Sequence, residues 1–322
     1  MRIYKFKSIL KSVLWGGNRL ATFKEMPLFD EPVGESWELS AMPGRESVVA
    51  EGDDRGMTLS QLVQRYGADL VGEKVYRRYG THFPLLIKFI DARRDLSIQV
   101  HPDDEMAHRL HGSMGKNEMW YILEADAGAL IRTGFNRSIN VEEFDRRLAD
   151  GTILDIINKT ESRPGETFYI PSGQIHAIGA GNLLVEIQRS SDVTYRVWDY
   201  DRRDAAGNLR ELHVQQAREA LNFAARDCQV HDMPRLDNGM TQLVRCRDFD
   251  VRRLELSGSH LLEYPVAHSF EVMICIKGGM TLKVDGMPLA EVRQGETVLV
   301  PAIADRVEMR GNGQLLLVSV PD

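Results

Sequence analysis

The sequence predicts a mainly β protein built from two copies of one β unit, with some helix added to the first copy. Short, β-branched apolar segments recur along the chain, bounded by glycine, proline or aspartate, as in LLIKFI, TFYIP and TVLVP. Their number and spacing are typical of a sandwich or barrel rather than of alternating β–α–β units. A second observation, an internal repeat, indicates that the β unit is duplicated.

The repeat is a Gly-Glu-Thr turn followed by a proline six residues after the glycine. It begins at Gly165 in GETFYIPSGQIHAI and at Gly295 in GETVLVPAIADRVEM. A glutamate-led apolar segment precedes each turn, starting at Glu118 in the first copy and at Glu271 in the second. The shared order of these features predicts two related β domains.

Two domains also agree with the length, since 322 residues suggest about two domains of roughly 150 residues each. We expect an N-terminal catalytic domain with helical insertions over residues 1–235, and a C-terminal domain without a metal site over residues 236–322. The copies differ where chemistry is expected. Five residues after its proline the first copy has His176, whereas the second has Arg306.

Helical periodicity is limited to four segments. Apolar residues recur at three- and four-residue spacing over residues 57–72, 103–112, 138–160 and 213–224. The second segment opens with Asp103 and Asp104, which are expected to stabilise the helix N-terminus. His108 and His111 lie within the same helix and are expected at the surface. The helices are therefore expected to be additions to a β framework.

The composition narrows the possible partners. A formal charge of −7 gives no reason to expect nucleic acid or an anionic membrane. Cys228, Cys246 and Cys275, with no CxxC spacing, indicate core thiols in a reducing compartment rather than a disulfide framework. Apolar runs stay far below the ~18 residues of a membrane span. We expect a cytoplasmic protein that is a monomer or small homo-oligomer.

Four polar side chains of the first copy can converge on one metal ion. Gln99 and His101 are two residues apart on an apolar strand, so they point to the same side. Glu118 begins the next strand, and His176 follows a Pro-Ser-Gly turn. Each alone would be an ordinary polar residue at a strand end. Together, one amide, two imidazoles and one carboxylate suit zinc or another divalent first-row metal, with positions left for water or substrate.

Several long strings resemble a known family. They are VLWGG, GESWELSAMP, FPLLIKFIDARRDLSIQVHPDD, GKNEMWYIL and FYIPSGQIHAIGAGNLLVEIQRSSDVTYRVWDYDR. Their content and order are similar to type I mannose-6-phosphate isomerase in its short bacterial form, from Leu14 to about Arg203, and the C-terminal third is similar more loosely. The resemblance implies two cupin-type β-barrel or jelly-roll domains, one Zn²⁺ per chain, and interconversion of mannose 6-phosphate and fructose 6-phosphate.

The resemblance also implies roles for individual residues. The metal ligands would be Gln99, His101, Glu118 and His176. The family's catalytic arginine falls on Arg196 of YRVWDY, and its active-site serine and lysine fall on Ser97 and Lys116. Glu186 of VEIQ matches an acidic residue of the family. Asn117 departs from the pattern, because related sequences usually have threonine or proline between the lysine and the glutamate.

Aldose–ketose isomerisation moves a proton between C1 and C2 through an enediol, and both oxygens gain negative charge. A divalent metal would stabilise that charge as a Lewis acid. Arg196 stays protonated at neutral pH, so we expect it to orient the sugar and stabilise the enediolate. The alternative is a salt bridge from Arg196 to Asp199 or Asp201. The base stays open among a water on the metal and the side chains of Glu186, Glu118 and Lys116.

The sequence leaves the phosphate site open, because it contains no glycine-rich phosphate loop. Ser97, Lys116 and Lys88 are candidates, although Lys88 in LLIKFI is interpreted as a strand-edge lysine that covers apolar surface. Trp15 and Trp37 are expected to pack in the core rather than to bind sugar.

Two other functions compete with isomerisation. One is a non-catalytic cupin that binds a sugar phosphate as a sensor or regulator. The other is a metal-dependent oxygenase or epimerase, which the glutamine beside His101 and the string YRVWDYDR disfavour, because oxygenases typically offer iron a facial histidine–carboxylate triad.

Overall fold

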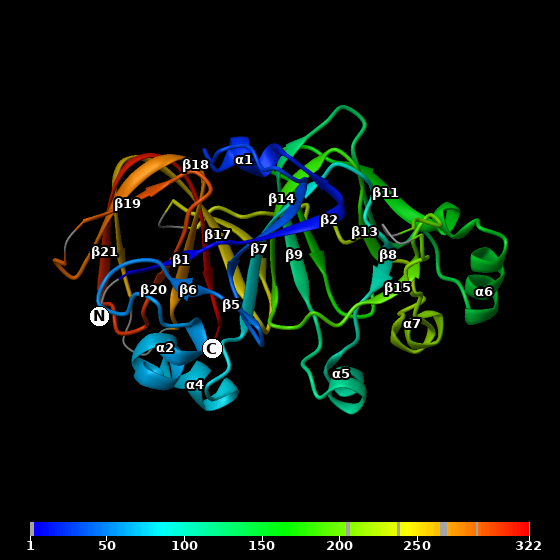
Figure 1. Ribbon diagram of the computed structural model, residues 1–322, viewed down its shortest axis with the longest axis horizontal. Coiled ribbons are helices and arrows are strands. Elements are labelled where there is room, and N and C mark those ends of the chain that lie inside the picture. The colour runs from blue at the N-terminus through cyan, green and yellow to red at the C-terminus, as the bar shows by residue number, and fades with distance from the viewer. Residues whose placement is uncertain (1–2, 204–206, 237–238, 265–268, 288, 322) are drawn as a thin grey trace.

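The computed structural model shows three large β-sheets side by side along its long axis, with helices at the periphery (Figure 1). It describes residues 3–203, 207–236, 239–264, 269–287 and 289–321. The predicted mainly β fold is confirmed. The word barrel is too strict, because the sheets of the described residues do not close into barrels.

Two antiparallel sheets form the first sandwich. The six-stranded sheet, in the order β12-β9-β14-β7-β3-β2, contains β2 (Ile9–Gly17), β3 (Val33–Leu39), β7 (Leu85–Ala92), β9 (Glu118–Ala125), β12 (Thr167–Ile170) and β14 (Asn182–Arg189). The five-stranded sheet, in the order β11-β10-β13-β8-β15, contains β8 (Ile98–Val100), β10 (Leu130–Phe135), β11 (Ile157–Glu161), β13 (His176–Ile178) and β15 (Tyr195–Trp198). Apolar side chains of both sheets, including Trp120 and Ile131, pack together between them.

Strand alternation gives the six-stranded sheet two different faces. Val185 and Ile187 of β14 pack into a core shared with the C-terminal sheet, together with Ile87 of β7. Lys88 follows Ile87, and Glu186 lies between Val185 and Ile187, so both point to the opposite face, towards the five-stranded sheet. That face therefore carries polar groups in a buried setting.

The third sheet is formed mainly by the C-terminal part of the chain. It has the order β16-β17-β21-β18-β20-β1-β6, with β19 beside β18. Its strands are β1 (Tyr4–Lys7), β6 (Val48–Val49), β16 (Thr241–Arg245), β17 (Asp250–Glu263), β18 (Glu271–Val284), β19 (Ala290–Arg293), β20 (Thr297–Val300) and β21 (Arg306–Ser319). Tyr4 lies opposite Leu299, so β1 joins the sheet from the other end of the chain. The domain division at residue 235 stays a prediction, and β1 crosses it in space.

The helices partly follow the predicted segments. They are α1 (Arg19–Phe23), α2 (Leu59–Tyr66), α3 (Ala68–Val71), α4 (Glu73–Tyr79), α5 (Asp104–His111), α6 (Val141–Ala149), the 3₁₀ turn η1 (Ile153–Ile156) and α7 (Val214–Ala220). Gly67, with positive φ, divides the first predicted helix into α2 and α3, and Gly72, also with positive φ, follows the end of α3. The prediction of a helix over residues 138–160 was wrong beyond Ala149. Gly151 has positive φ, and residues 157–161 form β11, which pairs with β10.

Several smaller predictions can be compared directly. Trp15 and Trp37 are buried as expected, and so are Cys228 and Cys275. Cys246 is only half-buried, and the three thiols are free. None of the helices that the structure describes has the length and apolar character needed to cross a membrane. A short hairpin, β4 (Ala41–Met42) and β5 (Arg45–Glu46), completes the strands.

Candidate metal centre and active site

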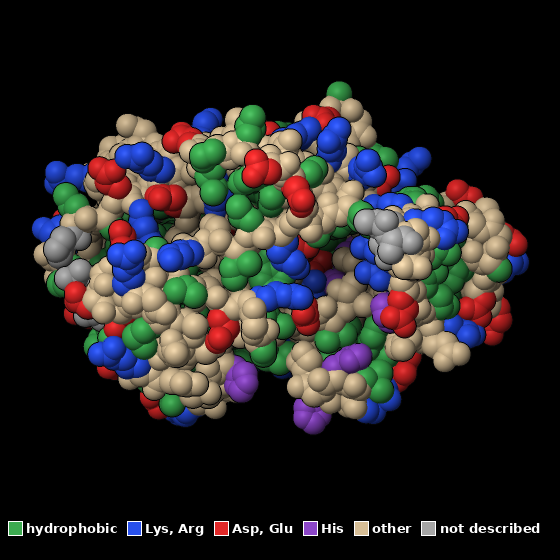
Figure 2. Space-filling model, in the orientation of Figure 1, with side chains coloured by type: hydrophobic (Ala, Val, Ile, Leu, Met, Phe, Trp, Pro, Cys, Tyr) green, Lys and Arg blue, Asp and Glu red, His purple; other side chains and the backbone are tan. Residues whose placement is uncertain are grey.

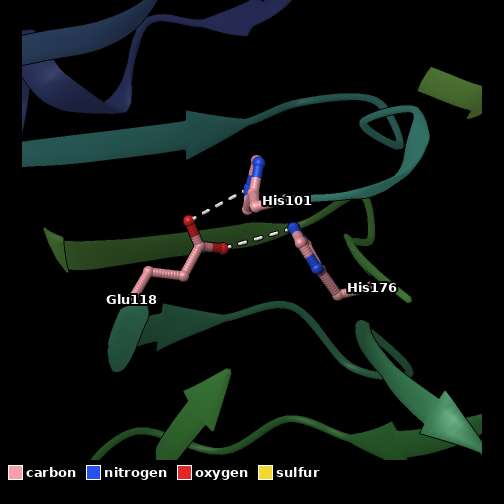
Figure 3. A group of neighbouring side chains, drawn as sticks. All are labelled: His101, Glu118 and His176. Atoms are coloured by element: carbon pink, nitrogen blue, oxygen red, sulfur yellow. Dashed lines mark ion pairs between the residues drawn. The ribbon is translucent and has the colours of Figure 1, made fainter. Parts of the chain in front are cut away.

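Three of the four predicted metal ligands lie together between the two sheets of the first sandwich (Figure 3). The Glu118 carboxylate points between the two imidazoles, with Oε2 3.3 Å from Nε2 of His101 and Oε1 3.3 Å from Nε2 of His176. All three side chains are at most 1 % exposed. One ligand atom from each residue lies within 4.8 Å of the others, so this group could hold a metal ion.

The local structure explains the convergence. Glu118 is the first residue of β9 in the six-stranded sheet, whereas His176 begins β13 in the five-stranded sheet. His101 directly follows β8, and Gln99 on that strand lies opposite His176 in the antiparallel register. The site is therefore built from strand ends of two facing sheets.

Backbone hydrogen bonds fix the orientation of both imidazoles. Nδ1 of His101 lies 2.9 Å from the carbonyl oxygen of Val193, and Nδ1 of His176 lies 2.9 Å from that of Gln174. A carbonyl oxygen only accepts, so each Nδ1 carries the hydrogen and each Nε2 presents a lone pair. Both Nε2 atoms lie 3.3 Å from the Glu118 carboxylate. This is the arrangement in which an outer hydrogen bond prepares histidine for a metal.

Electrostatics keep the three groups in metal-binding states. Burial, together with the charge of the nearby Lys116 ammonium, lowers the pKa of His101 to about 3. Burial also lowers the pKa of His176. Burial alone would raise the pKa of Glu118, but the charge of Lys116 holds that pKa well below its usual range. At neutral pH the site therefore has two neutral imidazoles and an ionised carboxylate, the protonation states that metals require.

The Glu118 carboxylate provides a test of whether a cation fits. Both of its oxygens are fully buried and have no hydrogen-bond partner within the described residues. The Lys116 ammonium makes an ion pair with Oε2 at 3.0 Å and lies 3.1 Å from Nε2 of His101. Buried carboxylates are normally hydrogen-bonded, and a carboxylate facing two lone pairs is repelled. A divalent cation fits this N/O donor set.

Gln99, the fourth predicted ligand, also lies near this group. The Gln99 amide nitrogen lies 3.3 Å from Nε2 of His176, so the amide reaches the site although the side chain is half-buried. Rotation of the amide by 180° would place its oxygen there instead. Ser97, which precedes β8, is 5 % exposed.

Arg196 extends the site on the neighbouring strand β15. It lies opposite Gln99 in the antiparallel register, so the two side chains share a face. Its Nη1 donates to the carbonyl oxygen of Glu211 at 2.7 Å, and its buried Nε has no hydrogen-bond partner within the described residues. Burial, with the charge of Arg210, lowers its pKa from the usual value.

The alternative role considered for Arg196 was a salt bridge. Asp199 instead pairs with Arg202 and Arg210, the latter at 2.6 Å. Within the described residues, no carboxylate, including that of Asp201, lies within ion-pair distance of the Arg196 guanidinium. Arg196 therefore keeps donors for another group.

The interpretation of Lys88 as a strand-edge lysine was wrong. The strand β7 lies inside the six-stranded sheet, between β14 and β3, and Lys88 is 8 % exposed. Its ammonium donates to Oε2 of Glu186 at 2.7 Å and to Oε1 of Gln188 at 2.8 Å. Trp120 donates to the other oxygen of Glu186 at 3.0 Å. The sequence signal that could have indicated this ion pair is a lysine in one apolar strand, LLIKFI, and a glutamate in another, LLVEIQ.

The remaining predictions concern the helix α5 and the second copy. Asp103 caps α5 by accepting from the backbone N–H of Met106. His108 and His111 are exposed, as predicted, and His111 lies 2.8 Å from the Tyr195 hydroxyl. In the second copy, Glu271 is buried against Arg252 at 2.8 Å, and Arg306 is exposed at the start of β21.

Comparison with known proteins gives the family. A model described as "Phosphomannose isomerase type I, catalytic domain" matches residues 3–131, and one described as "Mannose-6-phosphate isomerase, cupin domain" matches residues 239–320. The chain is 35 % identical over 315 residues to mannose-6-phosphate isomerase ManA of Bacillus subtilis, and 97 % of each chain is covered. The chain belongs to the type I mannose-6-phosphate isomerase family. It is therefore an enzyme with a cupin domain, as the sequence predicted.

Other members of the mannose-6-phosphate isomerase family agree with this assignment. The enzyme of Streptococcus mutans is 34 % identical, with 92 % of this chain and 91 % of that relative covered. The crystal structure of the Bacillus subtilis mannose 6-phosphate isomerase matches with a TM-score of 0.89 at 29 % identity, covering 99 % of this chain and 100 % of that chain. A phosphomannose isomerase variant from Salmonella typhimurium, 16 % identical with a TM-score of 0.82, shares the fold.

The surface is hollowed beside the five-stranded sheet. Figure 2 shows this hollow with basic side chains along its rim and acidic side chains deeper inside. A hollow with a basic rim suits an anionic ligand.

Proposed function

We propose that this chain interconverts mannose 6-phosphate and fructose 6-phosphate as a Zn²⁺-dependent isomerase, through an enediol. The carrying observation is the buried Glu118 carboxylate, which faces two imidazole lone pairs without a hydrogen-bond partner in the described residues. The relatives supply the substrate, because the curated proteins of Bacillus subtilis and Streptococcus mutans are both named mannose-6-phosphate isomerases. Those names also favour catalysis over a non-catalytic sensor.

The ion would be held by His101, Glu118 and His176, with Gln99 as a longer-range fourth ligand. When bound, a divalent ion supplies Lewis-acid stabilisation for the negative charge that develops on O1 and O2. The N/O donor set agrees with zinc.

Arg196 would stabilise charge on the substrate. A guanidinium stays protonated, and the buried Nε of Arg196 has no partner within the described residues. A donor that finds its acceptor only when the sugar oxygens become negative stabilises the transition state more than the bound substrate. Lys116 and Ser97 are proposed to contact the substrate beside it, and the Lys116 ammonium brings a second positive charge to the site.

Glu186 is our proposed base for the proton transfer between C1 and C2. It lies opposite Trp120 in the pairing of β14 with β9, on the face that also carries Glu118. Lys88 and Trp120 donate to its two oxygens at 2.7 and 3.0 Å, so the carboxylate has a fixed orientation in a buried setting. A positioned carboxylate of this kind is suited to general base catalysis.

A coupled assay that follows fructose 6-phosphate formation tests the proposed function. The assay is run on the protein as purified, after thorough chelation, and after return of Zn²⁺, with the metal content measured each time. We expect activity to disappear on chelation and to return with zinc. Activity that survived complete metal removal would refute the mechanism. Glu186→Gln should retain the metal and lose most of kcat, and unchanged kcat would exclude Glu186 as the base.

A further inference from the structure

Asn117 joins the site to the C-terminal part of the chain. Its neighbours Lys116 and Glu118 both point into the site, where they pair at 3.0 Å. The Asn117 side chain points elsewhere, and its Nδ2 donates to Oδ2 of Asp248 at 2.6 Å. Asp248 lies between β16 and β17, far along the chain. One amide therefore links the segment that carries two site residues to the C-terminal sheet.

The same amide also holds the turn that leads to His176. The Asn117 Oδ1 accepts from the backbone N–H of Ser172 at 2.8 Å. The next residue, Gly173, donates its backbone N–H to the carbonyl oxygen of His101 at 2.9 Å. The turn then supplies the Gln174 carbonyl that orients the His176 imidazole. A single hydrogen bond thus joins the Asn117 amide to the turn whose backbone contacts His101 and orients the His176 imidazole.

Asp248 is held in place by cations. It is 1 % exposed, and Arg78 donates to its Oδ1 at 3.2 Å. The guanidinium of Arg189 lies 3.5 Å from the same oxygen, and that of Arg247 lies 3.9 Å away. A buried carboxylate with several charged partners is a rigid acceptor, because moving it would leave a buried charge without its partner. Asp248 therefore offers Asn117 a fixed point.

Arg189 extends this network to the other side of Lys116. It also pairs with Asp104, whose Oδ1 accepts from the backbone N–H of Gly115 at 3.0 Å. The backbone N–H of Arg189 donates to the carbonyl oxygen of Asn117 at 3.1 Å. Residues on both sides of Lys116 are therefore tied to one network of charges, of which Arg189 and Asp248 are buried.

We infer that Asp248, acting through Asn117, is a positioning residue that fixes Lys116 and Glu118 against the turn leading to His176. The inference rests on the proposed function for its catalytic consequence. Residues that orient metal ligands through one intervening hydrogen bond typically contribute about 10–100-fold to metal affinity or activity. Small misplacements of reacting groups also reduce rates strongly. Contacts from the C-terminal sheet thus control the geometry of the site in the first sandwich.

Substitutions at both ends of the hydrogen bond test the inference. Asn117→Asp places a carboxylate against Asp248, so repulsion should displace the segment. Asn117→Ala removes both hydrogen bonds without adding charge, and it covers the case in which Asn117→Asp fails to fold. Asp248→Asn removes the negative charge. The double variant Asn117→Asp/Asp248→Asn reverses donor and acceptor and should restore the contact.

Three measurements are made on each variant: Zn²⁺ affinity by calorimetric titration of chelated protein, kcat and KM separately, and urea unfolding. We expect Asn117→Asp and Asn117→Ala to weaken Zn²⁺ binding about 10–100-fold and to lower kcat by a similar factor, while KM changes little. The double variant should recover most of the loss. Glu271→Gln is the control, because it removes another buried carboxylate charge paired with an arginine, and it should leave Zn²⁺ affinity unchanged.

The inference is overturned if both Asn117 variants bind Zn²⁺ like the unmodified protein, if the double variant is as impaired as Asn117→Asp, or if Glu271→Gln shows the same loss of zinc affinity. A failure of the proposed function looks different. In that case the unmodified protein binds Zn²⁺ without isomerising mannose 6-phosphate, and the titration still decides whether Asp248 and Asn117 position the ligands.

Discussion

Lys88 and Glu186 form a buried ion pair whose loss should be costly. Their charged atoms lie 2.7 Å apart, and their side chains are only 10 % and 5 % exposed. At an effective dielectric constant of ~20, two unit charges at this distance attract by about 6 kcal/mol. Burial of both charges offsets much of that attraction. Removing a single partner, however, leaves an uncompensated buried charge and typically costs about 3–5 kcal/mol.

Lys88→Met should therefore lower the free energy of unfolding by about 3–5 kcal/mol, measured by urea denaturation of metal-free protein. Lys88→Met/Glu186→Gln removes both charges and keeps an acceptor for Trp120, so it should be less destabilised than Lys88→Met alone. The difference from additivity gives the coupling of the pair. The single variant should also lose activity, because Glu186 would lose the cation that orients it.

An exposed ion pair provides the control for this cycle. Arg77 and Glu73 pair at 3.0 Å on α4, with side chains 71 % and 55 % exposed. Arg77→Met should change stability little, because solvent screens surface pairs. If Lys88→Met costs no more than Arg77→Met, the Lys88–Glu186 pair is not buried as described, and the assignment of Glu186 as an oriented base loses its support.

Three further predictions concern the site and the second copy. Arg196→Ala should lower kcat by about 10²–10³ while metal content stays near that of the unmodified protein, whereas His176→Ala should lose both; metal analysis beside the coupled assay separates them. Glu271→Gln should leave metal content unchanged and reduce stability, because Arg252 loses its partner. In metal-free protein the pKa of His101 is depressed to about 3, so between pH ~6.5 and pH 3 the unfolded chain binds the proton and the folded chain does not. The free energy of unfolding should therefore be highest above pH ~6.5 and fall by up to about 1.4 kcal/mol per pH unit as the pH is lowered towards 3. Urea unfolding from pH 7 to pH 5 tests this, and constant stability would contradict it.

The sequence was informative where one short pattern determines a local outcome. Alternation in QVH predicted that Gln99 and His101 share a side, and the repeat aligned Glu118 with Glu271 and His176 with Arg306. The structure brings these residues together as expected. The position of each of these residues depends on the alternation of side chains along a strand or on a turn. Alternation and turns are properties of a few neighbouring residues.

Contacts between distant segments could not be read in this way. Lys88 looks like a surface lysine in its own strand, and only the pairing of β7 with β14 shows that Glu186 faces it. Similarly, residues 157–160 continue an apparent helical pattern, but pairing with β10 favours a strand. Asn117 stood out only as a departure from the family pattern, and its partner Asp248 could not be predicted, because the two residues are 131 positions apart in the chain.

The strand β1 limits how the chain can be divided. A fragment that begins near residue 236 would contain β20 without β1, so the backbone N–H and C=O groups of Thr297–Val300 would be left unpaired on one side. That strand reads TVLV and is buried throughout. An unpaired apolar edge of this kind recruits strands from other molecules. This C-terminal fragment produced alone should therefore self-associate, and adding a peptide that spans Ile3 to Lys7 should reduce the aggregation.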